Sequence, residues 1–167
     1  MSRLIILRGN SGSGKTSVAK ALQQKFGSGT MLISHDVVRM EFLNVRGAEG
    51  IVKSEKLMIN LLKYGKDNSK ITIIEGILPS NDYEKLFNVA RSEFGENIFA
   101  YYYDLPFEET LIRHYTKSNC NDFGEAEMKR WWKDKDYLAT ISEVILDKNL
   151  SLEDAIELIY RQVSANE

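Results

Sequence analysis

The sequence predicts an α/β domain in which five parallel strands lie between two layers of helices. Three observations lead to this prediction. Short apolar runs alternate with amphipathic helical segments from one end of the chain to the other, which is typical of strand–helix–strand units. The first apolar run leads into a glycine-rich loop that opens a helix. No repeat, low-complexity tract or linker interrupts the 167 residues, so we expect a single domain over residues 1–167.

The composition excludes several classes of protein. Hydrophobic residues make up 43% and charged residues 28% of the chain, which is ordinary for a soluble globular protein. The net charge of −2 offers no global basic field for nucleic acid, so any such binding would have to be local. Cys120 is the one cysteine, and with only His35 and His114 elsewhere the sequence contains neither a disulfide framework nor a zinc cluster. Lacking a signal peptide or a membrane-spanning apolar run, it predicts a cytoplasmic protein with no membrane contact.

The glycine-rich loop matches the phosphate-binding pattern G-x-x-x-x-G-K-[ST]. Its residues are Gly9, Asn10, Ser11, Gly12, Ser13, Gly14, Lys15 and Thr16. Residues 4–7 before it form an apolar run typical of a buried parallel strand. Val18, Leu22 and Phe26 after it follow at helical spacing. Strand, loop and helix therefore occur in the order that a P-loop requires.

Each residue type in this loop suits a triphosphate. Glycine permits positive φ angles and lets backbone N–H groups approach an anion that side chains would block. The helix that follows contributes free N–H groups and its dipole. Lys15 supplies a positive charge for the β- and γ-phosphates, and Thr16 offers a hydroxyl to Mg²⁺. We therefore expect residues 9–16 to bind ATP and Mg²⁺.

The second predicted strand, residues 30–34, is followed by Asp36 and Arg39. Parallel α/β sheets place their chemistry at the carboxyl ends of strands, so Asp36 is expected where an acceptor substrate meets the γ-phosphate. Arg39 is one helical turn further on and is predicted on the same face. We interpret Asp36 as a general base and Arg39 as a clamp for substrate or anion. The alternative is a helix-capping aspartate with an i, i+3 ion pair.

The segment between the second and third strands has weak patterning. Residues 46–50 contain two glycines and predict a mobile loop. Ser54 then predicts the start of a helix that runs to about Tyr64 and ends at Gly65.

The third predicted strand, residues 71–76, carries Glu75 near its end. A carboxylate after an apolar run resembles a Walker-B acid, which holds Mg²⁺ through water or binds a substrate hydroxyl. Because the residue is Glu rather than the commoner Asp, metal and substrate roles both stay open. A purely structural role in capping the following loop is the alternative.

Two further strands and their helices complete the sheet. Ser80 or Asn81 predicts the cap of a helix that reaches Phe94, and residues 98–103 predict a fourth strand. We expect the three tyrosines of that strand to pack in the core rather than to stack on a base. Residues 141–146 predict the fifth strand, and Ser151 with Asp154 predicts the capped start of the final helix.

A lid is predicted at approximately residues 113–135. Pro106 begins a helix that ends near Arg113, a polar turn-rich loop spans residues 117–124, and a basic helix follows from Glu125. Helix, polar loop and basic helix form a segment able to cover a triphosphate. A solvated helical hairpin of mixed charge is the alternative. Cys120, in the lid loop, is interpreted as an exposed thiol rather than a nucleophile.

These motifs resemble the small P-loop kinases grouped around chloramphenicol phosphotransferase, the zeta-toxin kinases and the 5′-kinase domain of phage polynucleotide kinase. The likeness covers nearly the whole chain. It rests on residues 9–16, on Asp36 to Arg39, on Leu105 to Arg113, and on Lys129 to Leu138. It implies a three-layer P-loop NTPase, similar to nucleoside-monophosphate kinases, with a helical lid.

The resemblance also implies roles for individual residues. By resemblance Asp36 is the catalytic base, Arg39 supports the substrate or the phosphate, and Arg113 contacts the nucleotide phosphates. A basic residue of the lid helix is implied as a further phosphate ligand, and Arg130 is chosen over Lys129 and Lys133. The third-strand position varies in this group, so the resemblance does not settle the role of Glu75.

The sequence therefore predicts an ATP- and Mg²⁺-dependent kinase that transfers the γ-phosphoryl group to a hydroxyl of a small molecule, such as a nucleoside, a sugar nucleotide or an antibiotic-like compound. Its predicted catalytic residues are Lys15, Asp36, Arg39 and Arg113. A 5′-hydroxyl polynucleotide kinase and a nonenzymatic ATP-binding regulator are the alternatives. The missing N-K-x-D guanine signature argues against a GTP switch. The acceptor and the oligomeric state stay open.

Overall fold

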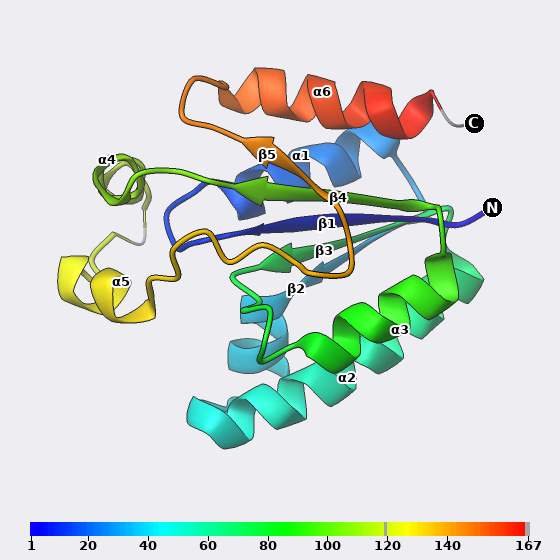
Figure 1. The fold of residues 1–167 in the computed structure, drawn as a ribbon, viewed down its shortest axis with the longest axis horizontal. Coiled ribbons are helices and arrows are strands. Elements are labelled where there is room, and N and C mark those ends of the chain that lie inside the picture. Colours follow the sequence, from blue (N-terminus) through cyan, green and yellow to red (C-terminus); the bar gives the residue numbers. More distant parts are fainter. Residues whose placement is uncertain (119, 166–167) are drawn as a thin grey trace.

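The computed structural model describes residues 1–118 and 120–165, and Figure 1 shows its ribbon. Its centre is a five-stranded parallel sheet, as predicted, and the strand order, which was not predicted, is β2-β3-β1-β4-β5. The strands are β1 (Arg3–Gly9), β2 (Thr30–Ser34), β3 (Ile71–Gly76), β4 (Ile98–Tyr103) and β5 (Glu143–Leu146). The predicted α/β fold class is therefore confirmed.

Helices cover both faces of the sheet (Figure 1). One face carries α1 (Lys15–Phe26) and α6 (Leu152–Ser164), and the other carries α2 (Gly47–Asn68) and α3 (Glu84–Phe94). Strand β1 supplies both cores, because successive side chains of a strand point to opposite faces. Ile5 and Leu7 pack with α1 and α6, whereas Leu4 and Ile6 pack with α2 and α3.

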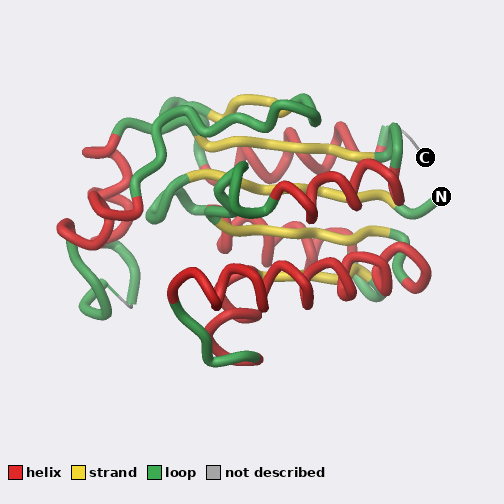
Figure 2. Tube along the Cα trace, turned by 60° about the horizontal axis from the view of Figure 1, so that its bottom comes forward, coloured by secondary structure: helices red, strands yellow, loops and turns green. Residues whose placement is uncertain are grey.

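The remaining helices lie at the carboxyl end of the sheet. They are a π-helical segment, η1 (Val37–Phe42), and the two helices α4 (Phe107–Tyr115) and α5 (Glu125–Trp131). Figure 2 shows α4 and α5 beyond the end of the sheet that is opposite the chain termini. They occupy the place that was predicted for the lid. Among the described residues, no helix is both long and apolar enough to span a bilayer.

The three tyrosines of β4 are buried as predicted, with exposed fractions of 1–3%. Tyr101 donates a hydrogen bond to Gln162 Oε1 at 2.7 Å, and Tyr102 accepts one from the backbone N–H of Asp136 at 3.2 Å. Burial raises the pKa of Tyr103 to about 12, so its hydroxyl stays protonated at neutral pH. Strand β5 is two residues shorter at its start than the prediction.

The predicted loop at residues 46–50 was wrong, because α2 already begins at Gly47. Tertiary packing overrides the local glycine signal here. Gly50 is buried where an added Cβ would lie 3.2 Å from the backbone of Val45, and Ile51 packs against the core. Ser54, the predicted cap, lies inside the helix and donates to the Ile51 carbonyl oxygen at 3.0 Å.

The start of α3 also differs from the prediction. Ser80 and Asn81 precede the helix, which begins at Glu84. A carboxylate from α2 serves its first turn instead, because the Leu86 N–H donates to Glu55 Oε1 at 3.1 Å. The helix end is thus satisfied by a residue distant in sequence, which no local capping pattern can indicate.

Gly65 does not end α2, which continues to Asn68. Its missing side chain lets the helix lie against the sheet. An added Cβ would lie 2.4 Å from Thr72 Oγ1 and 3.2 Å from Met31 Sδ.

We therefore expect Gly65→Ala to lower the free energy of unfolding by about 1–2 kcal/mol, since overpacking outweighs the gain in helix propensity. Chemical denaturation measures this change. Adding Thr72→Ala, which removes the crowded atoms, should recover most of the loss. A stabilised Gly65→Ala protein would contradict the packing argument.

Candidate active site

A cleft of about 1030 Å³ opens at the carboxyl ends of the strands, where the chemistry was predicted. Four parts of the chain line it: the P-loop with the start of α1, the ends of β2 and β3, the lid, and the segment between β5 and α6. The predicted site residues that line it are Ser11, Gly12, Ser13, Gly14, Lys15, Thr16, Asp36, Glu75 and Arg113. Gly9, Asn10, Arg39 and Arg130 are not among its lining residues.

The P-loop glycines adopt conformations that other residues avoid. Gly12 has a φ of 80°, and an added Cβ would lie 2.5 Å from the Thr110 carbonyl oxygen. Gly14 precedes α1 with a φ of 100°, and none of the described side chains caps this helix terminus. The first N–H groups of α1 therefore point into the cleft without a side-chain acceptor, an arrangement suited to a phosphate.

Lys15 is buried with an exposed fraction of 7%. Its Nζ donates to the Asn10 carbonyl oxygen at 2.8 Å and to Ser13 Oγ at 3.1 Å. Burial lowers the pKa of Lys15 to about 8, although the carboxylates of Glu75 and Asp36 act in the opposite direction. The ammonium is thus held over the P-loop with part of its hydration removed, and an anion in the cleft would stabilise its charged form.

This lowered pKa predicts a pH dependence of nucleotide affinity. In the free protein Lys15 loses its charge above about pH 8, whereas bound phosphates raise its pKa, so binding at alkaline pH takes up a proton. Affinity for Mg-ADP should be flat below about pH 7 and roughly tenfold weaker near pH 9. Titration calorimetry measures this. In Lys15→Arg the charge persists, so the loss should be much smaller, and equal pH profiles for both proteins would contradict the assignment.

Thr16 and Glu75 meet across the cleft, although 59 residues separate them. The Thr16 hydroxyl donates to Glu75 Oε1 at 3.1 Å, and the Ser34 hydroxyl donates to the same oxygen at 2.5 Å. Mg²⁺ prefers hard oxygen ligands and commonly uses one or two protein groups together with substrate phosphates. The donor set therefore fits Mg²⁺.

Asp36 and Arg39 lie in different surroundings. Asp36 is exposed and faces the cleft. Arg39 is half-buried, lines no part of the cleft, and has a buried Nε without a partner in the described chain. The predicted common face assumed an α-helix, but η1 closes with an i→i+5 bond from the Leu43 N–H to the Val38 carbonyl oxygen. The common face therefore lacks its assumed geometry, and the role of Arg39 as a clamp stays a prediction.

His35, beside Asp36, belongs to the structural support of the site. It is 4% exposed, and its Nε2 shares a short hydrogen bond with the hydroxyl of Tyr83, which also contacts Ser54 Oγ at 2.9 Å. Burial lowers the pKa of His35 to about 4, so the imidazole is neutral at physiological pH. Because His35 is neutral and does not line the cleft, Asp36 is the group of this segment that can present a charge to the cleft.

The lid brings two cations to the cleft. Arg113 donates to the Ser13 carbonyl oxygen at 3.0 Å and to Glu109 Oε1 at 2.8 Å. Lys117 also lines the cleft, and burial lowers its pKa while Glu75 and Asp36 oppose that shift. Lys117 was not predicted as a site residue, because it lies in the polar loop after α4, where no residue pattern marks it.

The other basic lid residues are turned elsewhere. Lys129 pairs with Glu125 at 2.6 Å, and the guanidinium of Arg130 lies over the ring of Trp131. Lys133 is exposed, and its backbone bonds to the side chain of Asn10. The choice of Arg130 as a phosphate ligand stays a prediction. Residues 148–152 also line the cleft, which was not predicted. Within this range the sequence indicated only the helix cap at Ser151, whose hydroxyl accepts from the Asp154 N–H at 3.1 Å as predicted.

Comparisons with known proteins agree with this architecture. No protein-family model matches the chain, and a comparison with curated proteins gives no match. Among solved structures, a gluconokinase from Sinorhizobium meliloti 1021 is similar over 98% of this chain and 93% of its own, with a TM-score of 0.66 and 13% identity. The APS kinase of Mycobacterium tuberculosis in complex with AMPPNP and APS is similar over 98% of both chains, with a TM-score of 0.65 and 18% identity.

A shikimate kinase from Acinetobacter baumannii in complex with shikimate is similar over 100% of this chain and 96% of its own, with a TM-score of 0.63 and 18% identity. At these identities the likeness shows the fold alone, an α/β fold that this chain shares with these three kinases. The narrower resemblance to the chloramphenicol phosphotransferase group stays a prediction.

Proposed function

We propose that this protein is an ATP- and Mg²⁺-dependent kinase that phosphorylates a hydroxyl group of a small molecule. The observation that carries the proposal is that one cleft contains the P-loop lysine, the Thr16–Glu75 pair and the exposed carboxylate of Asp36. A nucleotide-binding regulator would need the first two features, whereas the strand-end carboxylate suits an acceptor. The names of the structural neighbours, a gluconokinase and a shikimate kinase among them, support small acceptors.

The proposed reaction assigns a separate task to each group. Asp36 accepts the proton of the acceptor hydroxyl, whose oxygen bonds to the γ-phosphorus as the bond to the β,γ-bridging oxygen breaks and ADP leaves. Lys15, Arg113 and Lys117 offset the negative charge on the transferring group. Mg²⁺, held near Thr16 and Glu75, would neutralise charge on the β- and γ-oxygens when bound. The fixed positions of these groups supply the orientation on which phosphoryl transfer depends.

Two observations bear on the acceptor. The net charge of −2 disfavours a polynucleotide, for which a basic field is the usual means of binding. The wall beside Asp36 is formed by Val37, Gly76 and Ile77, so the acceptor surface combines apolar contacts with one carboxylate. We propose a nucleoside, a sugar nucleotide or an antibiotic-like alcohol as the acceptor class.

The test is transfer from γ-labelled ATP, with Mg²⁺, to nucleosides, sugar nucleotides, aminoglycoside and phenicol antibiotics, and 5′-hydroxyl oligonucleotides. Labelling of one small-molecule class that disappears in Asp36→Asn would support the proposal. Labelling of oligonucleotides alone would favour a polynucleotide kinase. Tight ATP binding without transfer to any wider set of alcohols would favour a regulator.

A further inference from the structure

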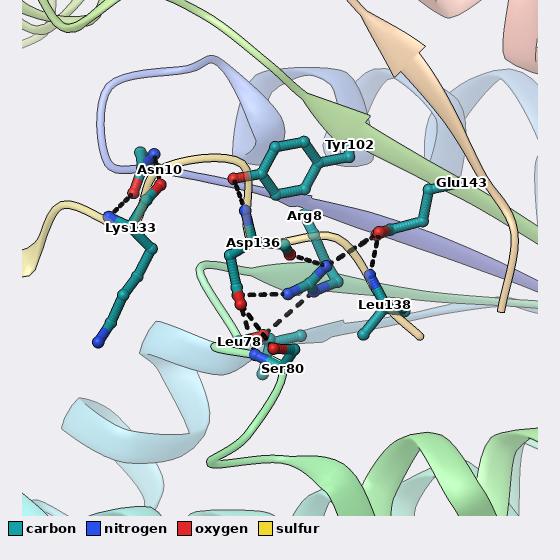
Figure 3. A network of polar contacts seen from close by, with 9 residues as sticks. All are labelled: Arg8, Asn10, Leu78, Ser80, Tyr102, Lys133, Asp136, Leu138 and Glu143. Atoms are coloured by element: carbon teal, nitrogen blue, oxygen red, sulfur yellow. Dashed lines mark hydrogen bonds and ion pairs between the residues drawn. The ribbon is translucent and has the colours of Figure 1, made fainter. Parts of the chain in front are cut away.

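Arg8 is a fully buried cation immediately before the P-loop. Its guanidinium joins three distant segments, namely the chain before β5, the loop after β3, and β5 itself (Figure 3). Its Nε donates to the Leu78 carbonyl oxygen at 3.1 Å. One terminal nitrogen donates to the Asp136 carbonyl oxygen and to Glu143 Oε1, both at 2.9 Å, and the other donates to Asp136 Oδ2 at 2.7 Å. The rings of Phe87 and Tyr102 lie within 5.5 Å of the guanidinium carbon.

The first of these segments is residues 132–142, here called the return segment, which leads from the lid helix α5 back to β5. It contains no helix or strand, so side chains must hold it in place. Asn10 of the P-loop donates to the Lys133 carbonyl oxygen at 2.6 Å and accepts from the Lys133 N–H at 2.8 Å. The Leu138 N–H donates to Glu143 Oε2 at 2.8 Å. The return segment is therefore tied to the sheet on both sides of Asp136.

The second segment is residues 76–80, here called the wall loop, whose Gly76 and Ile77 line the cleft beside Asp36. Leu78 is fully buried with a φ of 43°, a conformation that L residues rarely adopt without support from their surroundings. Arg8 supplies that support through the Leu78 carbonyl oxygen. Asp136 adds to it, because its carboxylate accepts from the Ser80 N–H at 2.9 Å and from the Ser80 hydroxyl at 2.5 Å.

One ion pair thus joins the return segment to the wall loop. The Arg8–Asp136 pair anchors the chain that follows the lid and also the loop that forms the acceptor wall, as Figure 3 shows. A buried ion pair is costly to assemble and contributes little net stability, but losing one partner leaves a buried charge poorly compensated. Such a pair fixes geometry more effectively than it adds stability. The two hydrogen bonds of Asn10 then connect the return segment to the P-loop.

We propose that Arg8, Asp136 and Asn10 are positioning residues that set the lid and the acceptor wall relative to the P-loop. Both polar atoms of the Asn10 side chain bond to the return segment, and the predicted contact of Asn10 with the nucleotide stays a prediction. The inference rests on the proposed function, since the groups being positioned are those that would hold nucleotide and acceptor. A purely structural role for the network would change thermal stability and leave nucleotide affinity alone.

A double-mutant cycle between Asn10→Ala and Asp136→Asn tests the proposal, with Mg-ADP as the probe. Titration calorimetry measures the Mg-ADP affinity of each protein. Trp131 and Trp132, the two tryptophans of the chain, stand where α5 meets the return segment, and their fluorescence follows the local structure there. Each single variant should weaken Mg-ADP binding about five- to tenfold. The double variant should be no weaker than the weaker-binding single, because both changes break the same connection. Glu157→Gln, which removes only exposed ion pairs far from this network, should bind like the wild type.

The possible outcomes separate the two proposals. The positioning role would be overturned if the double variant lost Mg-ADP affinity by the product of the two single losses. Unchanged Mg-ADP affinity in both single variants would overturn it as well. Failure of the wild type to bind Mg-ADP would overturn the proposed function instead. In that case acrylamide quenching of tryptophan fluorescence in the free protein still tests the link between Asn10 and the return segment. The quenching should increase in Asn10→Ala, which removes no buried charge. Unchanged quenching in that variant would overturn the inference even if Asp136→Asn failed to fold.

Discussion

Replacing Lys15 with alanine is expected to lower ATP turnover by roughly a thousandfold, the upper end of the cost of removing one transition-state donor. The structure explains why no neighbour can substitute for this group. Its ammonium is buried over the P-loop and held by the Asn10 carbonyl oxygen and Ser13 Oγ. Steady-state turnover of ATP measures the loss, both with and without an acceptor.

Lys20→Ala is the matched control for this experiment. Lys20 also lines the cleft, but it is exposed on α1, one turn beyond the loop. Its removal should change turnover less than about threefold, as expected for a solvated charge. If Lys15→Ala retained more than a tenth of the wild-type turnover, the P-loop lysine would not be the principal phosphate ligand.

Replacing Asp36 with asparagine is expected to abolish transfer to the acceptor while nucleotide affinity is kept. The amide has nearly the same shape as the carboxylate but cannot accept a proton, and loss of a general base costs about 10²–10⁴-fold in rate. Because the Asp36 carboxylate helps to keep Lys15 charged, Mg-ADP affinity should be compared near neutral pH, where Lys15 is protonated in either protein. Near neutral pH the Mg-ADP affinity of Asp36→Asn should differ from that of the wild type by less than about threefold.

The control for this second prediction is Glu41→Gln. Glu41 is an exposed acid on the same π-helical segment, and it does not line the cleft. Transfer by this variant should equal that of the wild type. Unimpaired transfer by Asp36→Asn would remove the assignment of Asp36 as the base and would direct attention to Glu75, the other carboxylate in the cleft.

The sheet could be predicted closely because its strands are local signals. Strands β2, β3 and β4 occupy the predicted residues, since each is an apolar run with clear ends. The errors fall where distant residues decide the local structure. The start of α2 depends on burial against Val45, and Gly65 stays helical because it packs on Thr72 of β3. A glycine read locally signals a turn, but its meaning depends on what approaches it.

The site was predictable to the same extent. The P-loop residues, Asp36 and Glu75 could be identified as candidates because each lies at or just after the end of a strand. The carboxyl ends of parallel strands meet at one edge of the sheet. The common face expected for Asp36 and Arg39 assumed an α-helix, whereas η1 is a π-helix, which residue spacing does not reveal, and Asp36 lines the cleft while Arg39 does not. The lid stays a prediction. Of the basic residues in its predicted range, Arg113 and Lys117 line the cleft, whereas Arg130 does not.

By itself, the sequence determined the α/β class and the strands, and it located the glycine-rich loop and the two strand-end carboxylates that line the cleft, because these depend on periodicity and on contiguous motifs. Only the tertiary structure decided which distant residues pair with one another to fix these elements in place. Arg8 lies in an apolar strand, where nothing near it in sequence indicates a partner, and its two carboxylates come from positions 128 and 135 residues further along the chain. A buried charge must be paired, but which residues pair with it is settled by folding and not by local pattern.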